Sequence, residues 1–506
     1  MPGCSNKATK ADSQSSTAVP TRSVIMLLAA SLTTAVIVEL MLYYRSESWG
    51  NSNNATTEFI ARSPTYAIFS KSESEDHLVH VKTLLHKFGY KRVDIDSDWN
   101  LLWAHDYPYA NFISLKSLSA NQLVNHFPGC GYLTNKVDLS TNTKRLTFLP
   151  QAFRLPEQSE LFLQYARSFP DKLFVQKHNE HRGIKIKAFR DVELNMSDSF
   201  VQEFLQNPFL VDGYKFDIGV YVVITSVNPL RAYIYTGDVL FRYCPKKYHP
   251  FDAEDINKYI VGDDYLPTWE VPSLRKYYTN FGASMRDAFE AYVRDQSMDP
   301  AGIWLQVEHI LRTTIQEKEK DIFDTFRSYK THNFFELMRF DFFIDANLNV
   351  YLMEANMSPN LSSAHFKSNS ILYNQVLYSV FSLVGIRPVS SHDYTNFMSA
   401  EVNDITDDKN LATGLNKCAK YKCDKSCNQE NCNLCLPCLS GSDYEIIKKA
   451  HREHLHRADM KRIFPKEIAN YRDFNFTSET KNMTRKNAWM TQWYAYKCEY
   501  DRTWCS

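Results

Sequence analysis

The sequence lacks a net charge, because its 58 lysines and arginines are balanced by 58 aspartates and glutamates. A chain without excess positive charge generates no global field that attracts nucleic acid, so we expect no nucleic-acid partner. No internal repeat is visible, which gives no support to a solenoid or propeller. The chain is rich in apolar residues: they make up 44% of its 506 positions, enough for a sizeable core, and the length allows two to four domains.

Cysteine is scarce over the first 400 residues, where only Cys4, Cys130 and Cys244 occur. The other eight cysteines lie between residues 418 and 505. In an oxidising compartment such a cluster forms a small module held by disulfides. In the cytosol, Cys427 and the C-x-x-C-x-x-C run that ends at Cys438 would suit a structural Zn²⁺ site. A clean pair of separated C-x-x-C motifs is missing, so disulfides are favoured over zinc.

The N-terminus divides into a polar tail and an apolar segment. Residues 1–22 are rich in Ser, Thr, Lys and Ala and are expected to be disordered. Residues 24–44 are apolar over about the ~20 residues that a bilayer-spanning helix needs, and Glu39 lies toward one end, where a charge is tolerated. No small-residue cleavage site clearly follows. We therefore expect an uncleaved single-pass anchor that holds the protein in a lipid bilayer.

The stretch richest in chemistry is FELMRFDFFIDANLNVYLMEANMSPNLSS, residues 335–363. Its two apolar and aromatic runs predict strands, and DANLN between them predicts a hairpin connection. Residues two apart in a strand share a face, so Glu354 and Asn356 do, and a register centred within DANLN would set Asp341 directly opposite Glu354. Mg²⁺ prefers carboxylate and carbonyl oxygens, so these three residues are candidate metal ligands. An ordinary hairpin with its acids on a solvated face is the alternative.

The segment VQEFLQNPFLVDGYKFDIGVYVVITSVNPLRAYIY (201–235) and this hairpin together resemble the tubulin–tyrosine ligase-like family. NHFPGCGYLTNKVDL (125–139) and FLPQAFRLP (148–156) resemble the N-terminal half of that family. The resemblance spans roughly residues 98–386, in several ordered motifs. It implies an α/β (α+β) core of the ATP-grasp type, in which two sheets clamp ATP, and we expect this core over residues 65–390.

The resemblance implies a phosphate-binding element at the end of an apolar strand. Lys177 takes the position of the family's first phosphate-binding lysine and is a candidate catalytic residue. Arg182 and Gly183 would form the phosphate loop, with one cation and backbone donors. The chain departs from the family at Lys185, where a second glycine is usual. For Lys177 alone, a surface lysine at the end of a strand is the alternative.

The resemblance also implies an adenine-binding hinge and a strand that follows it. Lys215 and Asp217, in the KFD motif, would approach the phosphates or ribose and the metal. Glu203 replaces a lysine or arginine that is usual in the hinge. The hinge residues are Gln202, Glu203, Phe204 and Leu205.

The arginine end of the implied site departs from the family. Gly219 stands where the family has an arginine two residues after Asp217. Loss of a guanidinium there would slow use of the phosphate by about 10²–10³, by analogy with the loss of one oxyanion donor. Arg242 lies near the family's second phosphate-facing arginine and is a candidate catalytic residue. Thr279 and Asn280 resemble the family's element near the γ-phosphate, without its histidine.

The implied function is the ligation of glutamate to glutamate side chains of tubulin C-terminal tails, with ATP and Mg²⁺ and through an acyl phosphate. An amine that attacks an acyl phosphate needs mainly positioning and charge neutralisation. Tyrosine and glycine stay open as donors. Two other functions stay open as well: an attenuated or non-catalytic membrane-anchored ATP-binding relative, and a lumenal ligase that acts on a non-tubulin protein.

Beyond the expected core, we predict a linker over residues 391–416 and a Cys-rich C-terminal segment over residues 417–506. A basic stretch in this segment is predicted to be a helix whose three histidines face solvent. These histidines are His451, His454 and His456.

The side of the membrane that the large domain occupies stays open. Three basic residues precede the apolar segment, against Arg45 and Arg62 after it, a weak bias that places the large domain in the lumen. Sequons for N-glycosylation add modest support. They lie at Asn54, Asn195, Asn356, Asn360, Asn475 and Asn482. Because Asn356 is also a candidate metal ligand, the number of sequons is a poor guide to topology.

Overall fold

The computed structural model describes residues 63–141, 146–178, 184–329, 333–388, 406–469, 471 and 474–506. The expected tail (1–22) and the expected membrane anchor (24–44) lie outside these residues. Among the residues that the structure describes, no helix combines the length and the apolar character needed to cross a membrane. The anchor at residues 24–44 therefore stays a prediction.

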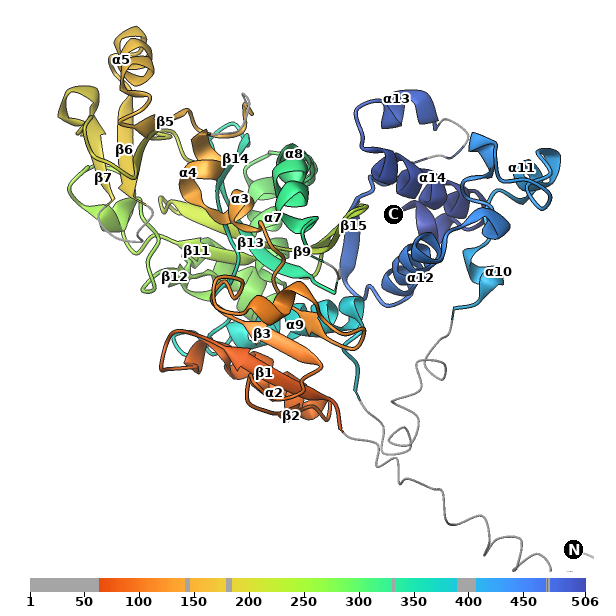
Figure 1. The fold of residues 1–506 in the computed structure, drawn as a ribbon. Coiled ribbons are helices and arrows are strands. Elements are labelled where there is room, and N and C mark those ends of the chain that lie inside the picture. Colours follow the sequence, from red (N-terminus) through yellow and green to blue (C-terminus); the bar gives the residue numbers. More distant parts are fainter. Residues whose placement is uncertain are drawn as a thin grey trace, which may run out of the picture. The chain divides into compact units, whose positions relative to one another are not determined.

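An antiparallel sheet of seven strands forms the centre of the fold (Figure 1). Its strands are β9 (Phe216–Val227), β10 (Leu230–Tyr235), β11 (Leu240–Tyr243), β12 (Leu266–Pro267), β13 (Glu336–Ile344), β14 (Val350–Asn356) and β15 (Met460–Phe464). One edge of β9 pairs with β11 and then with β10, and the other edge pairs with β13. β9 and β13 are buried along most of their length, which their β-branched and aromatic residues permit.

A second antiparallel sheet, with the strand order β5-β8-β6-β7, carries Lys177 of the expected phosphate element and Gln202 and Glu203 of the expected hinge. Its strands are β5 (Ala152–Leu155), β6 (Leu173–His178), β7 (Lys185–Ala188) and β8 (Ser199–Glu203). Helix α5 (Ser159–Ser168) packs on it through Phe162 and Ala166, and the rings of Phe162 and Phe174 meet edge to face at 5.0 Å. The mixed α/β core with these two sheets is consistent with the expected ATP-grasp fold.

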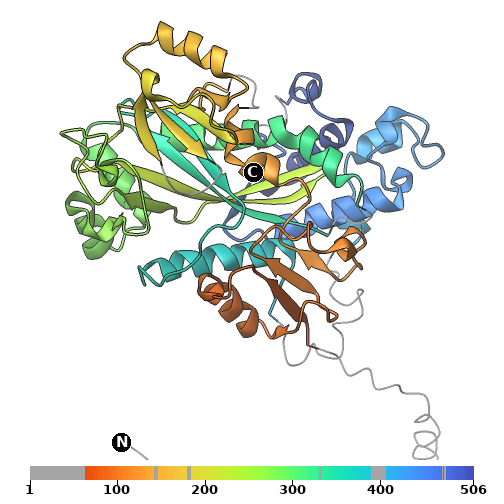
Figure 2. The same cartoon turned by 60° about the vertical axis from the view of Figure 1, so that its left-hand side comes forward.

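A third sheet is parallel, with the strand order β2-β1-β3-β4. Its strands are β1 (Thr65–Phe69), β2 (Lys91–Arg92), β3 (Leu101–Ala104) and β4 (Leu123–Val124). Helix α9 (Asn369–Val384) contacts β9 of the central sheet and also helix α2 (Val79–Lys87), which connects β1 to β2. It therefore joins the central sheet to the parallel sheet (Figure 2). The other helices of the core are α3 (Gly131–Thr134), α4 (Lys136–Thr141), α6 (Pro272–Arg275), α7 (Met285–Asp295) and α8 (Ala301–Phe326).

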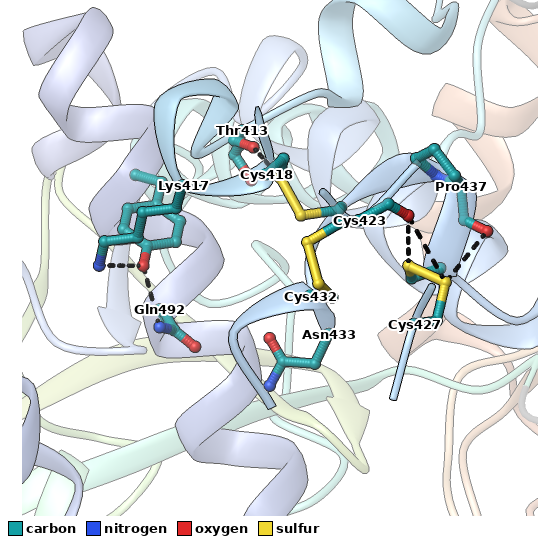
Figure 3. The surroundings of a disulfide bond; sticks show 12 residues. Thr413, Lys417, Cys418, Cys423, Cys427, Cys432, Asn433, Pro437 and Gln492 are labelled. Atoms are coloured by element: carbon teal, nitrogen blue, oxygen red, sulfur yellow. Dashed lines mark hydrogen bonds between the residues drawn. A yellow bond between two sulfur atoms is a disulfide. The ribbon is translucent and has the colours of Figure 1, made fainter. Parts of the chain in front are cut away.

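The C-terminal segment has an apolar core of its own and four disulfides. The disulfides are Cys418–Cys435, Cys423–Cys432, Cys427–Cys438 and Cys498–Cys505. Figure 3 shows the first three close together, with Asn433 beside them. Its helices are α10 (Asp408–Leu411), α11 (Leu415–Lys420), α12 (Gly441–Leu455), α13 (Phe476–Thr480) and α14 (Arg485–Tyr500). The prediction of disulfides rather than zinc is confirmed, and Cys130 and Cys244 are buried free thiols.

Part of the expected linker packs into this C-terminal segment. Residues 389–405 lie outside the described part of the chain, but Leu411 is buried, and its carbonyl accepts a hydrogen bond from the Trp493 indole at 3.1 Å. Similarly, the Trp489 indole donates to the carbonyl of Asn433 at 3.0 Å. These two bonds tie α14 to α10 and to the disulfide loops.

The prediction of a solvated histidine face is wrong for two of the three histidines. His451 and His454 on α12 are buried and stack on Trp504, with ring centroids 5.3 Å and 3.6 Å apart. Burial, followed by the nearby charge of Arg457, lowers the pKa of His454 to about 2, so this ring is neutral. The reason for the error is that the C-terminal residues fold back and cover this face of the helix.

A buried ion pair joins the C-terminal segment to the central sheet. Arg231 on β10 donates through Nε and Nη2 to the Glu453 carboxylate of α12, at 2.7 Å and 2.9 Å. Thr225 and Tyr233 donate hydroxyl hydrogen bonds to the same carboxylate at 3.0 Å and 2.9 Å. Strand β15 also pairs with β10. The segment therefore completes the sheet rather than forming a separate appendage.

Glu453→Gln is expected to lower the free energy of unfolding by about 3–5 kcal/mol, because it leaves Arg231 buried without a counter-charge. Denaturant unfolding followed by circular dichroism measures this change. Glu430→Gln is the matched control, since Glu430 is exposed. A loss for Glu453→Gln below about 1 kcal/mol, the range of surface pairs, would contradict the role of this ion pair.

Candidate active site

The hairpin of β13 and β14 has the predicted register at its acidic residues. Asp341 pairs with Glu354, and the connection spans residues 345–349, as expected. The amide Nδ2 of Asn356 donates to Asp341 Oδ2 at 3.1 Å and to Glu354 Oε1 at 3.3 Å. The structure therefore brings the three candidate metal ligands into contact on one face of the hairpin.

Two arginines hold Asp341 in place. Arg339 donates through Nε and Nη2 at 2.7 Å and 2.8 Å, and Arg242 donates through Nη2 at 3.0 Å. Arg242 also forms a two-bond pair with Asp217, at 2.8 Å and 2.9 Å. Burial opposes the charge of Arg242, but Asp217 and Asp341 outweigh it and hold the pKa of the guanidinium above its usual range. Acids and arginines thus alternate along a network in which Arg339 and Asp341 are buried and Arg242 and Asp217 are half-buried.

Two lysines from different elements, Lys136 and Lys177, act on Glu354. Lys136 of α4 forms an ion pair with its carboxylate at 2.9 Å. Burial raises the pKa of Glu354, but the charges of Lys136 and then Lys177 outweigh it and lower the pKa to about 2. The pKa of Lys177 is lowered to about 8, mainly by burial; Glu354 opposes this shift, and the charges of Lys136 and Lys215 add to it. Such convergence of ammonium groups beside carboxylates suits a ligand that carries phosphates and a divalent cation.

The expected hinge residues on β8 face opposite sides of their sheet. Gln202 is buried, and its Oε1 accepts a hydrogen bond from Lys177 Nζ at 3.1 Å. Its Nε2 is buried and has no hydrogen-bond partner among the described residues. An unsatisfied buried donor is costly, and a hydrogen-bond acceptor of a nucleotide base would satisfy it. This orphaned donor is an observation that fits a nucleotide beside Lys177.

Glu203, the neighbour of Gln202, is held on the other face of the sheet. Its carboxylate accepts a hydrogen bond from Tyr165 at 2.6 Å and pairs with Lys172 at 2.7 Å. The acid at this position is therefore held by two side chains of its own sheet face. Phe204 packs on Phe251, Leu205 is half-buried, and the structure gives neither side chain a contact with Glu354.

Several expected site residues do not join the cluster. Lys215 lies 5.6 Å from the ring of Phe343 and acts on the cluster through its charge, which reaches Lys177 and Asp217. Thr279 and Asn280 are exposed on the short helical turn Lys276–Asn280 and make no hydrogen bond to the cluster. Arg182 and Gly183 lie outside the described residues.

Sequence reasoning missed two residues of the cluster, Lys136 and Arg339. Lys136 is the only lysine or arginine in the NHFPGCGYLTNKVDL motif (125–139), and a lone cation in a motif of the family could have pointed to it. Arg339 stands two positions before Asp341, so strand alternation already placed the two side chains on one face.

A cleft of about 860 Å³ opens beside Asn356 and Lys136. It is lined by polar and aromatic side chains, among them His105, Tyr107, Tyr132 and Asn135. This volume lies within the roughly 300–1,000 Å³ of small-molecule sites. The cleft therefore offers room for a second substrate next to the carboxylate and lysine cluster.

The two sheets, together with the carboxylates Asp341 and Glu354 and the neighbouring lysines Lys136 and Lys177, are consistent with a mixed α/β protein of the ATP-grasp type. The family model described as "Tubulin-tyrosine ligase family" matches residues 114–394. The chain belongs to the tubulin–tyrosine ligase family.

The chain is similar to curated members of this family. It is 41% identical over 447 residues to "Probable tubulin polyglutamylase ttll-15" of Caenorhabditis elegans, which covers 86% of this chain and 85% of the relative. It is 26% identical over 453 residues to "Tubulin monoglutamylase TTLL4" of Mus musculus, over 82% of this chain and 37% of the relative. It is 26% identical over 307 residues to "Tubulin polyglutamylase TTLL6" of Homo sapiens, over 56% of this chain and 33% of the relative. The matches to the two mammalian proteins thus cover only about a third of their length.

Proposed function

We propose that the protein is an ATP- and Mg²⁺-dependent ligase that adds glutamate to glutamate side chains of tubulin C-terminal tails. The observation that carries this proposal is the convergence of Lys136 and Lys177 on Glu354, beside Asp341 and Asn356. The family supports a ligase, and the names of the three relatives support glutamate as donor and tubulin as acceptor.

Each part of the cluster has a separate task. When bound, ATP supplies the phosphoryl group that activates the acceptor carboxylate. Lys136 and Lys177 neutralise phosphate charge, while the oxygens of Asp341, Glu354 and Asn356 are suited to hold Mg²⁺. Arg242, fixed by its two bonds to Asp217, adds a guanidinium to the same site. Attack by an amine then needs mainly positioning, which the adjoining cleft offers.

Incorporation of labelled amino acid tests the proposal. The full-length protein with ATP, Mg²⁺, microtubules and labelled glutamate is expected to transfer label to tubulin, and omission of ATP or Mg²⁺ should prevent the transfer. Labelled tyrosine and glycine, run in parallel, test the choice of donor. If ATP binds and no donor is transferred, the proposal fails.

The lowered pKa of Lys177, about 8, predicts a pH dependence of nucleotide binding. Because binding needs the charged ammonium, affinity for ATP is expected to fall as pH rises above 8. Lys177→Arg should hold the affinity to higher pH, since a guanidinium stays protonated. Fluorescence titration with a labelled ATP analogue between pH 7 and pH 10 measures both effects. Equal pH profiles for the two proteins would contradict the role of Lys177.

The same lowered pKa fixes the sign of a stability effect. The folded state releases the proton of Lys177 near pH 8, whereas the unfolded chain holds it until about 10.5. Between these pH values the unfolded chain binds more protons, so the contribution of Lys177 to stability rises with pH.

The four disulfides favour a second candidate, a ligase whose large domain lies in the lumen and acts on a secretory-pathway protein. The sequon asparagines Asn195, Asn360, Asn475 and Asn482 are exposed, which is compatible with this placement. Residues 24–44 would supply the membrane anchor. Protease treatment of intact microsomes separates the candidates: digestion of the large domain places it in the cytosol, and protection without detergent places it in the lumen.

A further inference from the structure

Gly219 on β9 lies against the side chain of Arg339 on β13. The two strands pair Gly219 with Asp341, and Arg339 is two positions from Asp341 on the same face. A Cβ atom at position 219 would lie 2.8 Å from Cδ and 3.2 Å from Nε of Arg339. A contact of 2.8 Å is one that real Cβ atoms essentially never make, so the Arg339 side chain would have to shift. Arg339 therefore occupies the space that a side chain at position 219 would need.

Arg339 cannot easily move out of that space. Its side chain is only 9% exposed, and two of its nitrogens are bound to the Asp341 carboxylate. A bidentate pair of this kind fixes the plane of the guanidinium. The third nitrogen, Nη1, makes no hydrogen bond within the described part of the chain. Arg339 also lies close enough to Glu354 for its charge to lower the pKa of that carboxyl.

We propose that Arg339 supplies, from β13, the guanidinium that the family resemblance leads us to expect at position 219 of β9. Arg339 is a positioning residue: it orients Asp341 and adds one positive charge where the nucleotide phosphates would bind. In this chain the arginine lies on β13 rather than on β9, and the glycine at position 219 leaves the space that the Arg339 side chain occupies. Gly219 therefore does not deprive the site of an arginine charge, and this weakens the alternative that the protein is an attenuated or non-catalytic ATP-binding relative. The inference rests on the proposed function.

An exchange of the two residues tests the proposal. Gly219→Arg alone is expected to lose activity, because two guanidinium groups would compete for one space. Arg339→Gly alone is expected to lose about 10²–10³ in kcat, with a smaller change in KM for ATP. The double variant G219R/R339G, which restores one arginine, should regain most of that loss. If the two substitutions act independently, the fold-losses in activity of the two single variants multiply in the double variant. That result would overturn the proposal.

Nucleotide binding gives a readout that does not need amino-acid transfer. Arg339→Gln should weaken binding of ATP about tenfold and leave binding of AMP nearly unchanged, because the lost charge acts on the outer phosphates. Arg339→Lys, which keeps the charge and loses the fork, should fall in between. Equal weakening of ATP and AMP would mark a structural role and overturn the proposal. If the unaltered protein binds ATP with this discrimination and transfers no amino acid, the proposed function fails while the role of Arg339 stands.

A cavity of about 550 Å³ lies at the end of β9 that is remote from Asp217. Thr225, which lines it, is eight positions from Asp217, or roughly 26 Å along an extended strand. Three half-buried cations also line it: Arg387 after α9, and Lys449 and Arg452 on α12. The only acid in its lining, Glu453, is already bound by Arg231. We refer to this cavity as the cationic pocket.

The charges of Glu453 and Glu445 reach Lys449, but no carboxylate of the described residues pairs directly with the three cations of the cationic pocket. Within the part of the chain that the structure describes, none of their side chains forms an ion pair or a hydrogen bond. Burial and then the charge of Arg231 lower the pKa of Lys449 to about 8, and burial and then Arg452 lower that of Arg387. A bound anion would offset both the cost of burying these positive charges and the repulsion between them. We infer that the cationic pocket binds a small molecule with two or more phosphate or carboxylate groups.

Thermal unfolding with pyrophosphate, without Mg²⁺ and at constant ionic strength, tests this second inference. Pyrophosphate is expected to raise the Tm of the unaltered protein and of the Lys177→Gln variant. The increase should vanish in the triple variant R387Q/K449Q/R452Q, which should still bind ATP. If the triple variant does not fold, Lys449→Gln alone should weaken the effect at least several-fold. A shift that vanishes in Lys177→Gln, that persists without the three cations, or that is absent from the start would overturn the inference.

Discussion

Glu354→Gln is expected to lower the rate of glutamate ligation by about 10²–10³ while the protein stays folded. The substitution removes one carboxylate from the candidate Mg²⁺ ligands and the counter-charge of Lys136. It also removes the negative charge that opposes the lowered pKa of Lys177. Ligation measured over a range of Mg²⁺ concentrations, with circular dichroism as the check of folding, gives the result.

Glu308→Gln is the matched control for this substitution. Glu308 also pairs with a partly exposed lysine, Lys461, at 2.9 Å, but it lies on helix α8, outside the carboxylate cluster. It should keep the unaltered rate. Full activity of Glu354→Gln at moderate Mg²⁺ would exclude Glu354 from the metal site.

Reduction of the C-terminal disulfides is expected to unfold the C-terminal segment. Each of the three bonds between residues 418 and 438 closes a loop of 9 to 17 residues, and loops of this size contribute about 2–4 kcal/mol each. The segment also supplies β15 and the Glu453 carboxylate to the central sheet. Loss of the segment should therefore lower the Tm of the whole protein.

Hydrogen exchange and differential alkylation measure this effect. With a reductant, amide protection over residues 406–506 should fall before that of β9 and β13. Without a reductant, the eight C-terminal cysteines should resist alkylation in denaturant, while the buried thiols of Cys130 and Cys244 react once the protein unfolds. Alkylation of the C-terminal cysteines in the unreduced protein from its native compartment would contradict the disulfides and favour the cytosol.

The local chemistry of the metal hairpin could be predicted from the sequence. Alternation along a strand and the length of the DANLN connection fix which residues face one another, so the pairing of Asp341 with Glu354 followed directly. The contact of Asn356 with both acids followed from the same alternation. Such short-range rules need no knowledge of the rest of the fold.

The long-range partners could not be predicted in this way. The pairing of the cysteines is one of many combinations that spacing alone allows. The contact between Gly219 and Arg339 depends on β9 and β13 being neighbours, although 120 positions separate them in the sequence. The burial of His451 and His454 depends on Trp504, which returns from the far end of the chain. Each of these features is decided by packing rather than by local pattern.

The most direct test of the account is a crystal structure with Mg²⁺ and a non-hydrolysable ATP analogue. We expect the phosphates within hydrogen-bond distance of Lys136 and Lys177, the metal on oxygens of Asp341, Glu354 and Asn356, and the Nε2 of Gln202 bonded to the base. A nucleotide bound elsewhere, with the ion pair of Lys136 and Glu354 unchanged and the carboxylate cluster without metal, would contradict it.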